Sequence, residues 1–218
     1  MDTSKRVRHG DLSSKGWRAL PTGLLPAVRS GKFGFMLIYS MSVSADGFIY
    51  DRDGDFNWEP FSDELRDFHL EQVSGLGAYI LGRRLYETMR VWDTDPAMRE
   101  TAENAAFADV WGHLPKVVFS RTLHSVDRTA RLATASVADE VAATLATTDL
   151  DVSIGGSDLA AQAIALDLVD DYRMFRFPVI VGGGARYFPS VDSVLPLELV
   201  ESRVFGSQVV FERYRRIR

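Results

Sequence analysis

Five short segments of the sequence are rich in small, flexible or basic residues, a composition typical of sites that bind phosphate groups. Glycine leaves backbone N–H groups accessible, and the forked guanidinium group of arginine donates paired hydrogen bonds to phosphate oxygens. A nicotinamide dinucleotide with an additional 2′-phosphate would suit such donors. The segments are SADG (44–47), GRR (82–84), SRT (120–122), GGSD (155–158) and GGGAR (182–186).

The segment around Gly155 and Gly156 can be interpreted in two ways, as a phosphate-binding turn or as a connection without a ligand. Residues 151–154 alternate like a strand, and the spacing from Ser157 onward is helical, with Ser157 as the expected N-cap. A helix N-terminus offers free N–H groups to an anion. The alternative is a tight strand–helix connection without a ligand. Likewise, each arginine taken singly fits a solvated helix turn or a rim charge.

The elements that position these segments are a series of strands separated by helices. Strands are expected at 35–43, 78–81, 116–120, 151–154 and from 170 into the triple glycine that ends at 184, and a terminal hairpin at 197–214. Helices are expected at 63–73, from Arg83, at 96–107, at 136–146 and from Ser157.

This order predicts the α/β fold class, with a mostly parallel sheet, flanking helices and an antiparallel edge formed by the hairpin. Parallel sheets bind ligands outside the carboxyl ends of their strands. Each of the five segments follows a predicted strand, so we expect them to converge at one edge of the sheet. The convergence favours a binding site more than any single segment does.

The composition limits the classes of function. The 218 residues suit one sizeable domain, and the absence of cysteine excludes disulfides, a thiolate nucleophile and zinc–thiolate sites. The net charge of −5 argues against a nucleic-acid binder, and no apolar run suffices to cross a membrane. We expect a cytoplasmic protein. Residues 1–34 are basic and aperiodic, which predicts a poorly ordered extension before a domain at 35–218.

Several common motifs are missing. Residues 51–62 resemble a calcium-binding loop, but Gly54 is fourth instead of sixth and Ser62 stands where a glutamate is needed. The four histidines lack metal-ligand spacing, so no metal is expected. The sequence has no nucleophile elbow, Walker loop or Gly-x-Gly-x-x-Gly fingerprint. A dinucleotide site must therefore be built on a fold other than the Rossmann fold.

Five motifs in a fixed order resemble the dihydrofolate-reductase-like family, over about residues 35 to 214. The closest branch is the reductase domain of the bifunctional riboflavin-biosynthesis deaminase-reductases, without a deaminase zinc motif. The resemblance implies a three-layer fold, bound NADPH, a homodimer and reduction of a small heterocycle such as 5-amino-6-(5-phosphoribosylamino)uracil. The motifs are SADGFI, LGRRLYE, PKVVFSRTL, IGGSDLAAQ and FPVIVGGGARYFP.

The resemblance also assigns roles to individual residues. Those implied for the cofactor are Gly82, Arg83, Arg84, Ser120, Arg121, Gly155, Gly156, Ser157 and Gly182. Those implied for the substrate side are Ser44, Ala45, Gly47 and Gly183, with Asp46 as the catalytic residue. The sequence departs from the family at Leu85, where a threonine often follows the basic pair and contacts phosphate.

The proton donor is less evident from the sequence. Folate reductases place a carboxylate on the first helix beyond a tryptophan, and here Asp63 and Asp67 follow Trp58. Both also fit exposed carboxylates that favour a helix start. Asp46 is the preferred residue for substrate contact, although an Asx turn with Gly47 would also explain it. Two other functions stay open: a true dihydrofolate reductase, and a non-catalytic NADP(H)-binding protein.

Overall fold

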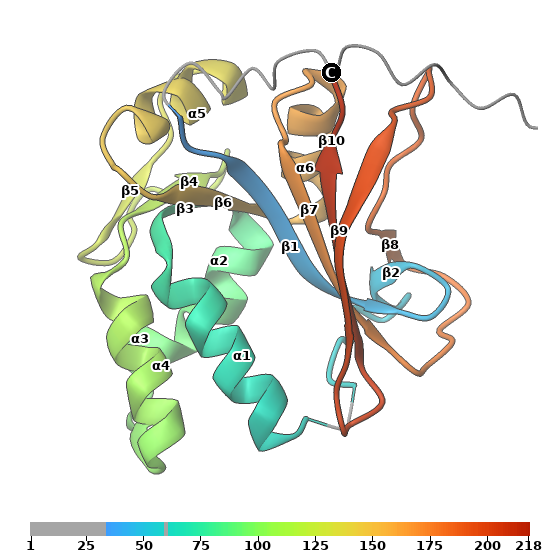
Figure 1. Ribbon diagram of the computed structural model, residues 1–218. Helices are drawn as coiled ribbons and strands as arrows, with labels where there is room; N and C mark the ends of the chain where they lie inside the picture. Colours follow the sequence, from blue (N-terminus) through green and yellow to red (C-terminus); the bar gives the residue numbers. More distant parts are fainter. Residues whose placement is uncertain (1–33, 59–60) are drawn as a thin grey trace, which may run out of the picture.

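An eight-stranded sheet lies between two layers of helices in the computed structural model, which describes residues 34–58 and 61–218 (Figure 1). The strand order is β5-β4-β3-β6-β1-β7-β10-β9. The strands are β1 (Leu37–Ser44), β3 (Leu76–Gly82), β4 (Lys116–Phe119), β5 (Ala130–Leu132), β6 (Asp151–Gly155), β7 (Asp171–Phe177), β9 (Leu197–Val204) and β10 (Val210–Arg216).

The direction of the strands confirms the predicted fold class. The pairings from β5 across to β7 are parallel, and the hairpin of β9 and β10 adds the antiparallel edge. Two short strands, β2 (Phe48–Tyr50) and β8 (Ala185–Arg186), form a separate antiparallel pair beside the end of β1. These two strands and β5 were not expected from the sequence, because two or three residues carry no readable alternation.

The helices divide between the two faces of the sheet (Figure 1). On one face lie α1 (Asp63–Ser74), α2 (Arg83–Met89), α3 (Val91–Thr94), the 3₁₀ helix η1 (Pro96–Arg99) and α4 (Ala102–His113). The other face carries α5 (Val137–Leu145) and α6 (Ser157–Ala165).

The alternation of side chains along β3 shows how one strand serves both layers. Ala78 and Ile80 pack in the core beneath α5 and α6, whereas Leu81 packs with Tyr86 and Trp111 on the opposite face. All five side chains are at least 98% buried. Since successive side chains of a strand point to opposite faces, a strand that is apolar throughout must be covered on both sides.

Three expected boundaries are wrong. The helix after Gly156 begins at Ser157, so Gly156 is its N-cap and Ser157 belongs to the first turn. The strand from residue 170 ends at Phe177, because Pro178 has no N–H to continue the ladder, and a loop then leads to the triple glycine. The single helix expected at 96–107 is divided into η1 and α4, since Thr101 caps a new helix by accepting from the N–H of Asn104.

Helix α1 holds a histidine against the sheet. Leu65 and Phe68 are its buried apolar side chains, and Ser62 caps its N-terminus. The ring of His69 stacks on Phe175 at 3.8 Å between centroids, and its Nε2 atom is buried without a hydrogen-bond partner in the described residues. Burial lowers the pKa of His69 from 6.5 to about 4. The fold therefore holds this imidazole in its neutral form.

The buried His69 predicts a loss of stability in mild acid. The unfolded chain takes up a proton below the ordinary pKa of 6.5, whereas the folded chain resists protonation until about 4, so stability falls as the pH drops through this window. We expect a loss of about 2 kcal/mol between about pH 7.5 and about pH 5, measured by urea unfolding. His69→Phe keeps a stacked ring and should remove this part of the loss. An equal loss in both proteins would contradict the assignment to His69.

Candidate functional site

The five segments rich in small, flexible or basic residues lie along one edge of the sheet. The strands that precede them, β4, β3, β6, β1 and β7, are consecutive neighbours and run parallel. Four segments directly follow a strand end, and the fifth lies in the loop after β7. The predicted convergence is therefore present, and we call this row of strand ends the carboxyl edge.

The backbones of β3 and β6 approach closely where they leave the sheet. A Cβ atom on Gly156 would lie 3.6 Å from the backbone nitrogen and Cα of Gly82. Gly156 also has a φ of +96°, a conformation that L side chains rarely adopt. Its carbonyl accepts from the N–H of Ala160, so helix α6 starts directly at this crossing.

Gly155 has a packing role beside any role in binding. It is buried, and a Cβ there would overlap the side chain of Leu85 on α2. The departure from the family pattern at Leu85 thus fills space against β6 rather than presenting a hydroxyl group. Gly155 is needed for contact between α2 and the strand, while Gly156 is the position that is open toward solvent.

Helix α2 begins with two exposed arginines. Arg83 lies 3.6 Å from Glu87 in a solvent-exposed pair of the kind that contributes little to stability. Arg84 donates from Nη1 to the phenol oxygen of Tyr50 at 3.3 Å. Tyr50 is the last residue of β2, which follows β1 in the sequence. This contact therefore links the segment after β3 to the segment after β1. Tyr50 was not predicted as a site residue, because its sequence position gives no sign of the contact.

The exit of β4 is a tight turn. The hydroxyl oxygen of Ser120 accepts from the N–H groups of Thr122 and Leu123, at 3.1 and 2.9 Å. Its own O–H is left to donate to a ligand. Arg121 is exposed on this turn. At the β6 exit Ser157 is half-buried, and Asp158 adds a negative charge to the first turn of α6.

Asp46 joins two loops of the carboxyl edge. Its carboxylate accepts from the hydroxyl of Ser44 at 2.6 Å and from the N–H groups of Val181 and Gly182 at 3.2 and 2.8 Å. These hydrogen bonds, first that of Ser44, hold the pKa of Asp46 below its ordinary value. Asp46 is thus an ionised acceptor that fixes the loop after β7, an arrangement that suits orienting a ligand better than donating a proton.

The glycines of the β7 loop are held by residues that follow β1. Arg52 donates from Nη2 to the carbonyl of Gly182 at 2.8 Å, and its side chain occupies the space where a Cβ of Gly183 would lie. Gly184 has a φ of +125°, and a Cβ there would overlap the carbonyl of Tyr50. Glycine at position 184 is therefore required by the backbone itself.

A pocket of about 260 Å³ opens beside this pair of loops. Arg186 lies over the ring of Phe48 at 4.8 Å, and Arg176 donates to the carbonyl of Ala45 and pairs with Glu212. Arg176 was missed because a single basic residue within a strand gives no signal of function. The pocket is lined by Ala45, Asp46, Gly47, Met174, Arg176, Arg186, Tyr187 and Phe188.

The carboxylates of α1 lie in solvent. The side chain of Asp63 is 86% exposed and pairs with Arg66, and Asp67 is exposed as well. Trp58 packs edge-on against Phe177, at 6.1 Å between ring centroids. This arrangement favours the expectation that the two aspartates stabilise the helix start.

Two features are absent from the described residues. Residues 34–58 and 61–218 contain no cluster of three or more His, Cys, Asp or Glu side chains placed to hold a metal ion. Within the same ranges, every helix is too short or too polar to span a membrane.

Comparison with known proteins gives one matching family and a set of similar folds. The RibD C-terminal domain matches residues 36–211. An uncharacterized protein of Bacillus subtilis (strain 168), YyaP, is 28% identical over 180 residues, which are 80% of this chain and 91% of that protein.

Three solved structures share the fold. A putative riboflavin biosynthesis protein from Shewanella sp. PV-4 has a TM-score of 0.69 at 21% identity, covering 84% of this chain and all of that one. The diaminohydroxyphosphoribosylaminopyrimidine deaminase/5-amino-6-(5-phosphoribosylamino)uracil reductase of Thermotoga maritima has a TM-score of 0.59 at 19% identity, covering 84% of this chain and 57% of that one. Dihydrofolate reductase of Enterococcus faecalis, complexed with NADP(H), has a TM-score of 0.57 at 16% identity, covering 84% and 97%. The dihydrofolate-reductase-like architecture is thereby confirmed.

The crossing at Gly156 gives a direct test of the carboxyl edge. If the pyrophosphate of NADPH binds at this crossing, as the family resemblance implies, Gly156→Asp should abolish NADPH binding in a fluorescence titration, because a carboxylate would occupy the space of the pyrophosphate. The positive φ adds about 1 kcal/mol of strain, and circular dichroism should still show a folded protein. Gly34→Asp is the matched control, since Gly34 has a φ of +82° and open space around it. Unchanged NADPH affinity in Gly156→Asp would remove this crossing from the site.

Proposed function

The chain belongs to the RibD C-terminal domain family, and on this basis we propose that it is an NADPH-dependent reductase of a pyrimidine-like heterocycle. The substrate we propose resembles 5-amino-6-(5-phosphoribosylamino)uracil, the compound named for the Thermotoga maritima relative of this fold. The protein would act as a homodimer, as the family resemblance implies, and the molar mass in solution tests that part.

The observation that carries this proposal is the crossing of β3 and β6 at the carboxyl edge. Gly82 and Gly156 leave no side chain between the two strand ends, and α6 begins at the same point. Helix N-termini and bare backbone N–H groups favour a pyrophosphate. Arg83 and Arg84 lie on one side of this crossing, and Arg121 follows the neighbouring strand.

The residues present fit the proposed cofactor in charge and in shape. Gly156 and Ser157 would hold the pyrophosphate at the start of α6, and Ser120 and Arg121 would flank the 2′-phosphate. NADPH, when bound, supplies a hydride to the acceptor. The residues of the protein would orient the reacting rings and exclude competing water.

The loops joined by Asp46 would form the substrate side. The ionised carboxylate fixes the backbone from Val181 to Gly182 against the end of β1. Ser44 is fully buried and donates to Asp46, which keeps the hydroxyl from rotating freely. Because the pKa of Asp46 is lowered, the proton that follows the hydride comes from another group or from water.

The exposed carboxylates of α1 argue against the folate-reductase alternative. That mechanism needs a carboxylate on the first helix directed into the cleft, whereas the side chain of Asp63 is 86% exposed. A turnover assay separates the remaining alternatives. Oxidation of NADPH in the presence of the ribitylamino- or phosphoribosylamino-pyrimidine supports the proposal, oxidation with dihydrofolate alone supports the folate enzyme, and tight binding without turnover supports a non-catalytic protein.

The arginines of the carboxyl edge predict a preference for the phosphorylated cofactor. NADPH should bind more tightly than NADH, and Arg121→Ala should reduce the difference by about tenfold, since a charge-assisted hydrogen bond contributes about 1.5–3 kcal/mol. Isothermal titration with both cofactors measures the ratio. Arg99→Ala is the control, because Arg99 pairs with Asp109 on the helical layer. Equal affinity of the unmutated protein for both cofactors would refute the role of Arg121.

A pair of aspartate variants tests the substrate side. Asp46→Asn should lower kcat/KM by about 10²-fold or more, because the amide nitrogen that replaces one carboxylate oxygen cannot accept from an N–H group, which displaces the β7 loop. Asp63→Asn should change activity less than about twofold, as expected for a solvated residue. Melting temperatures of both variants separate loop displacement from unfolding. An inactive Asp63→Asn together with an active Asp46→Asn would instead favour the folate mechanism.

A further inference from the structure

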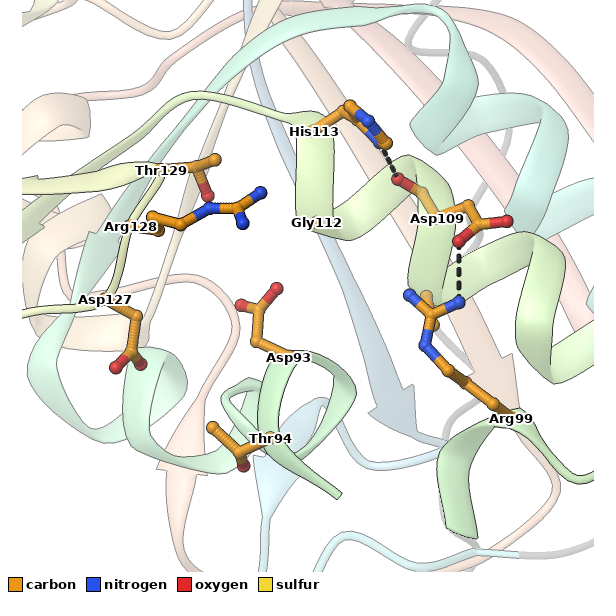
Figure 2. Close-up of a pocket in the computed structure, with 10 residues that line it drawn as sticks. Asp93, Thr94, Arg99, Asp109, Gly112, His113, Asp127, Arg128 and Thr129 are labelled. Carbon is orange, nitrogen blue, oxygen red and sulfur yellow. Dashed lines mark hydrogen bonds and ion pairs between the residues drawn. The ribbon is translucent and has the colours of Figure 1, made fainter. Parts of the chain in front are cut away.

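A second pocket lies at the amino end of β4, away from the carboxyl edge. Its volume is about 420 Å³, and its walls come from α3, η1, α4 and the connection between β4 and β5 (Figure 2). The four residues of β4 span about 10 Å between this pocket and the Ser120 turn. The pocket is lined by Asp93, Thr94, Arg99, Ala108, Asp109, Gly112, His113, Asp127, Arg128 and Thr129.

Two of its three carboxylates are paired with arginines. Asp109 accepts from Arg99 at 2.6 Å, as the dashed line in Figure 2 marks. Asp127 accepts two hydrogen bonds from Arg90, at 2.6 and 3.0 Å. Each of these charges is therefore balanced by an arginine before any ligand is considered.

The third carboxylate, Asp93, is held from behind by buried groups. Its Oδ2 atom accepts from the indole N–H of Trp111 at 2.9 Å and lies 3.9 Å from the ammonium nitrogen of Lys116. Lys116 is 2% exposed and also donates to the carbonyl of Leu114 and the hydroxyl of Thr129, each at 3.0 Å. These contacts fix the position of the Asp93 carboxylate and tie α4 to the opposite wall.

Arg128 is the cation left in excess. Its guanidinium group extends into the pocket toward the side where Asp93 lies (Figure 2), and no carboxylate of the described residues lies within 4.0 Å of it. His113 donates from Nδ1 to the carbonyl of Asp109 at 2.7 Å, so Nε2 is the ring nitrogen left for another partner. Gly112 and Ala108 keep the space between these groups open.

We propose that this pocket binds a small hydroxylated phosphomonoester, distinct from the cofactor and substrate of the carboxyl edge. The planar fork of Arg128 matches phosphate oxygens, and Oδ1 of Asp93 accepts from a hydroxyl group of the same molecule. Among the described residues, the wall has no Phe, Tyr or Trp side chain on which a nucleobase could stack. A compact sugar or polyol phosphate therefore fits the pocket better than a nucleotide does.

A titration with glycerol 3-phosphate, followed through backbone amide signals in NMR, tests the proposal. We expect saturable shifts at Gly112, Arg128 and Thr129, and binding at least about tenfold weaker in Arg128→Ala. Arg128 is exposed, so this variant should fold. Arg83→Ala is the matched control for phosphate binding at the carboxyl edge and should leave these shifts unchanged.

The comparison probe is inorganic phosphate, which lacks the hydroxyl groups and should bind more weakly than glycerol 3-phosphate. Arg128→Lys keeps the charge without the fork and should lose part of the affinity. Equal titrations of the unmutated protein and Arg128→Ala would overturn the proposal. Shifts confined to Gly82 and Gly156, or no saturable shift at all, would overturn it as well, and neither result bears on the reductase activity.

Discussion

The close approach of two backbones at the ends of β3 and β6 is the constraint on which the candidate site depends. No side chain stands between Gly82 and Gly156, since a Cβ on Gly156 would lie in van der Waals contact with Gly82 at 3.6 Å, and the side chain of Leu85 packs against Gly155 only because Gly155 has no Cβ. The approach brings the starts of α2 and α6 side by side. Unpaired N–H groups of both helices are then available at one place, together with the exposed Arg83 and Arg84.

A second consequence of the parallel sheet is that distant loops become neighbours. Since β1 and β7 are adjacent and parallel, the residues after each strand meet at the same edge. Asp46 joins them by accepting two hydrogen bonds from the β7 loop and is held by a third from Ser44 of its own segment, and Arg52 adds another link through the carbonyl of Gly182. An ionised carboxylate that accepts three hydrogen bonds is a rigid support. These hydrogen bonds lower the pKa of Asp46, a residue whose chemical type alone would suggest a proton donor.

The opposite end of the sheet is organised by buried charge. Asp171 at the start of β7 is fully buried and accepts from Arg173 and Arg213, at 2.8 and 2.9 Å, which secures the antiparallel strand β10 beside β7. Removal of this carboxylate would leave Arg173 and Arg213 without an opposite charge, and Arg173 is only 7% exposed. The amino ends of the strands therefore carry stabilising ion pairs, whereas the carboxyl edge displays arginines toward solvent.

The sequence by itself determined the order of the main strands and helices, the α/β class and the residues at the strand ends. These features follow from local rules, because alternation, helical spacing and glycine position are written into a few consecutive residues. It also allowed the family resemblance that the match over residues 36–211 confirms. Only the tertiary structure decided which groups meet. The contact of Tyr50 with Arg84, the placement of Arg176 beside Ala45 and the second pocket around Arg128 join residues from separate elements. Their partners depend on sheet order and helix packing, which no local pattern encodes.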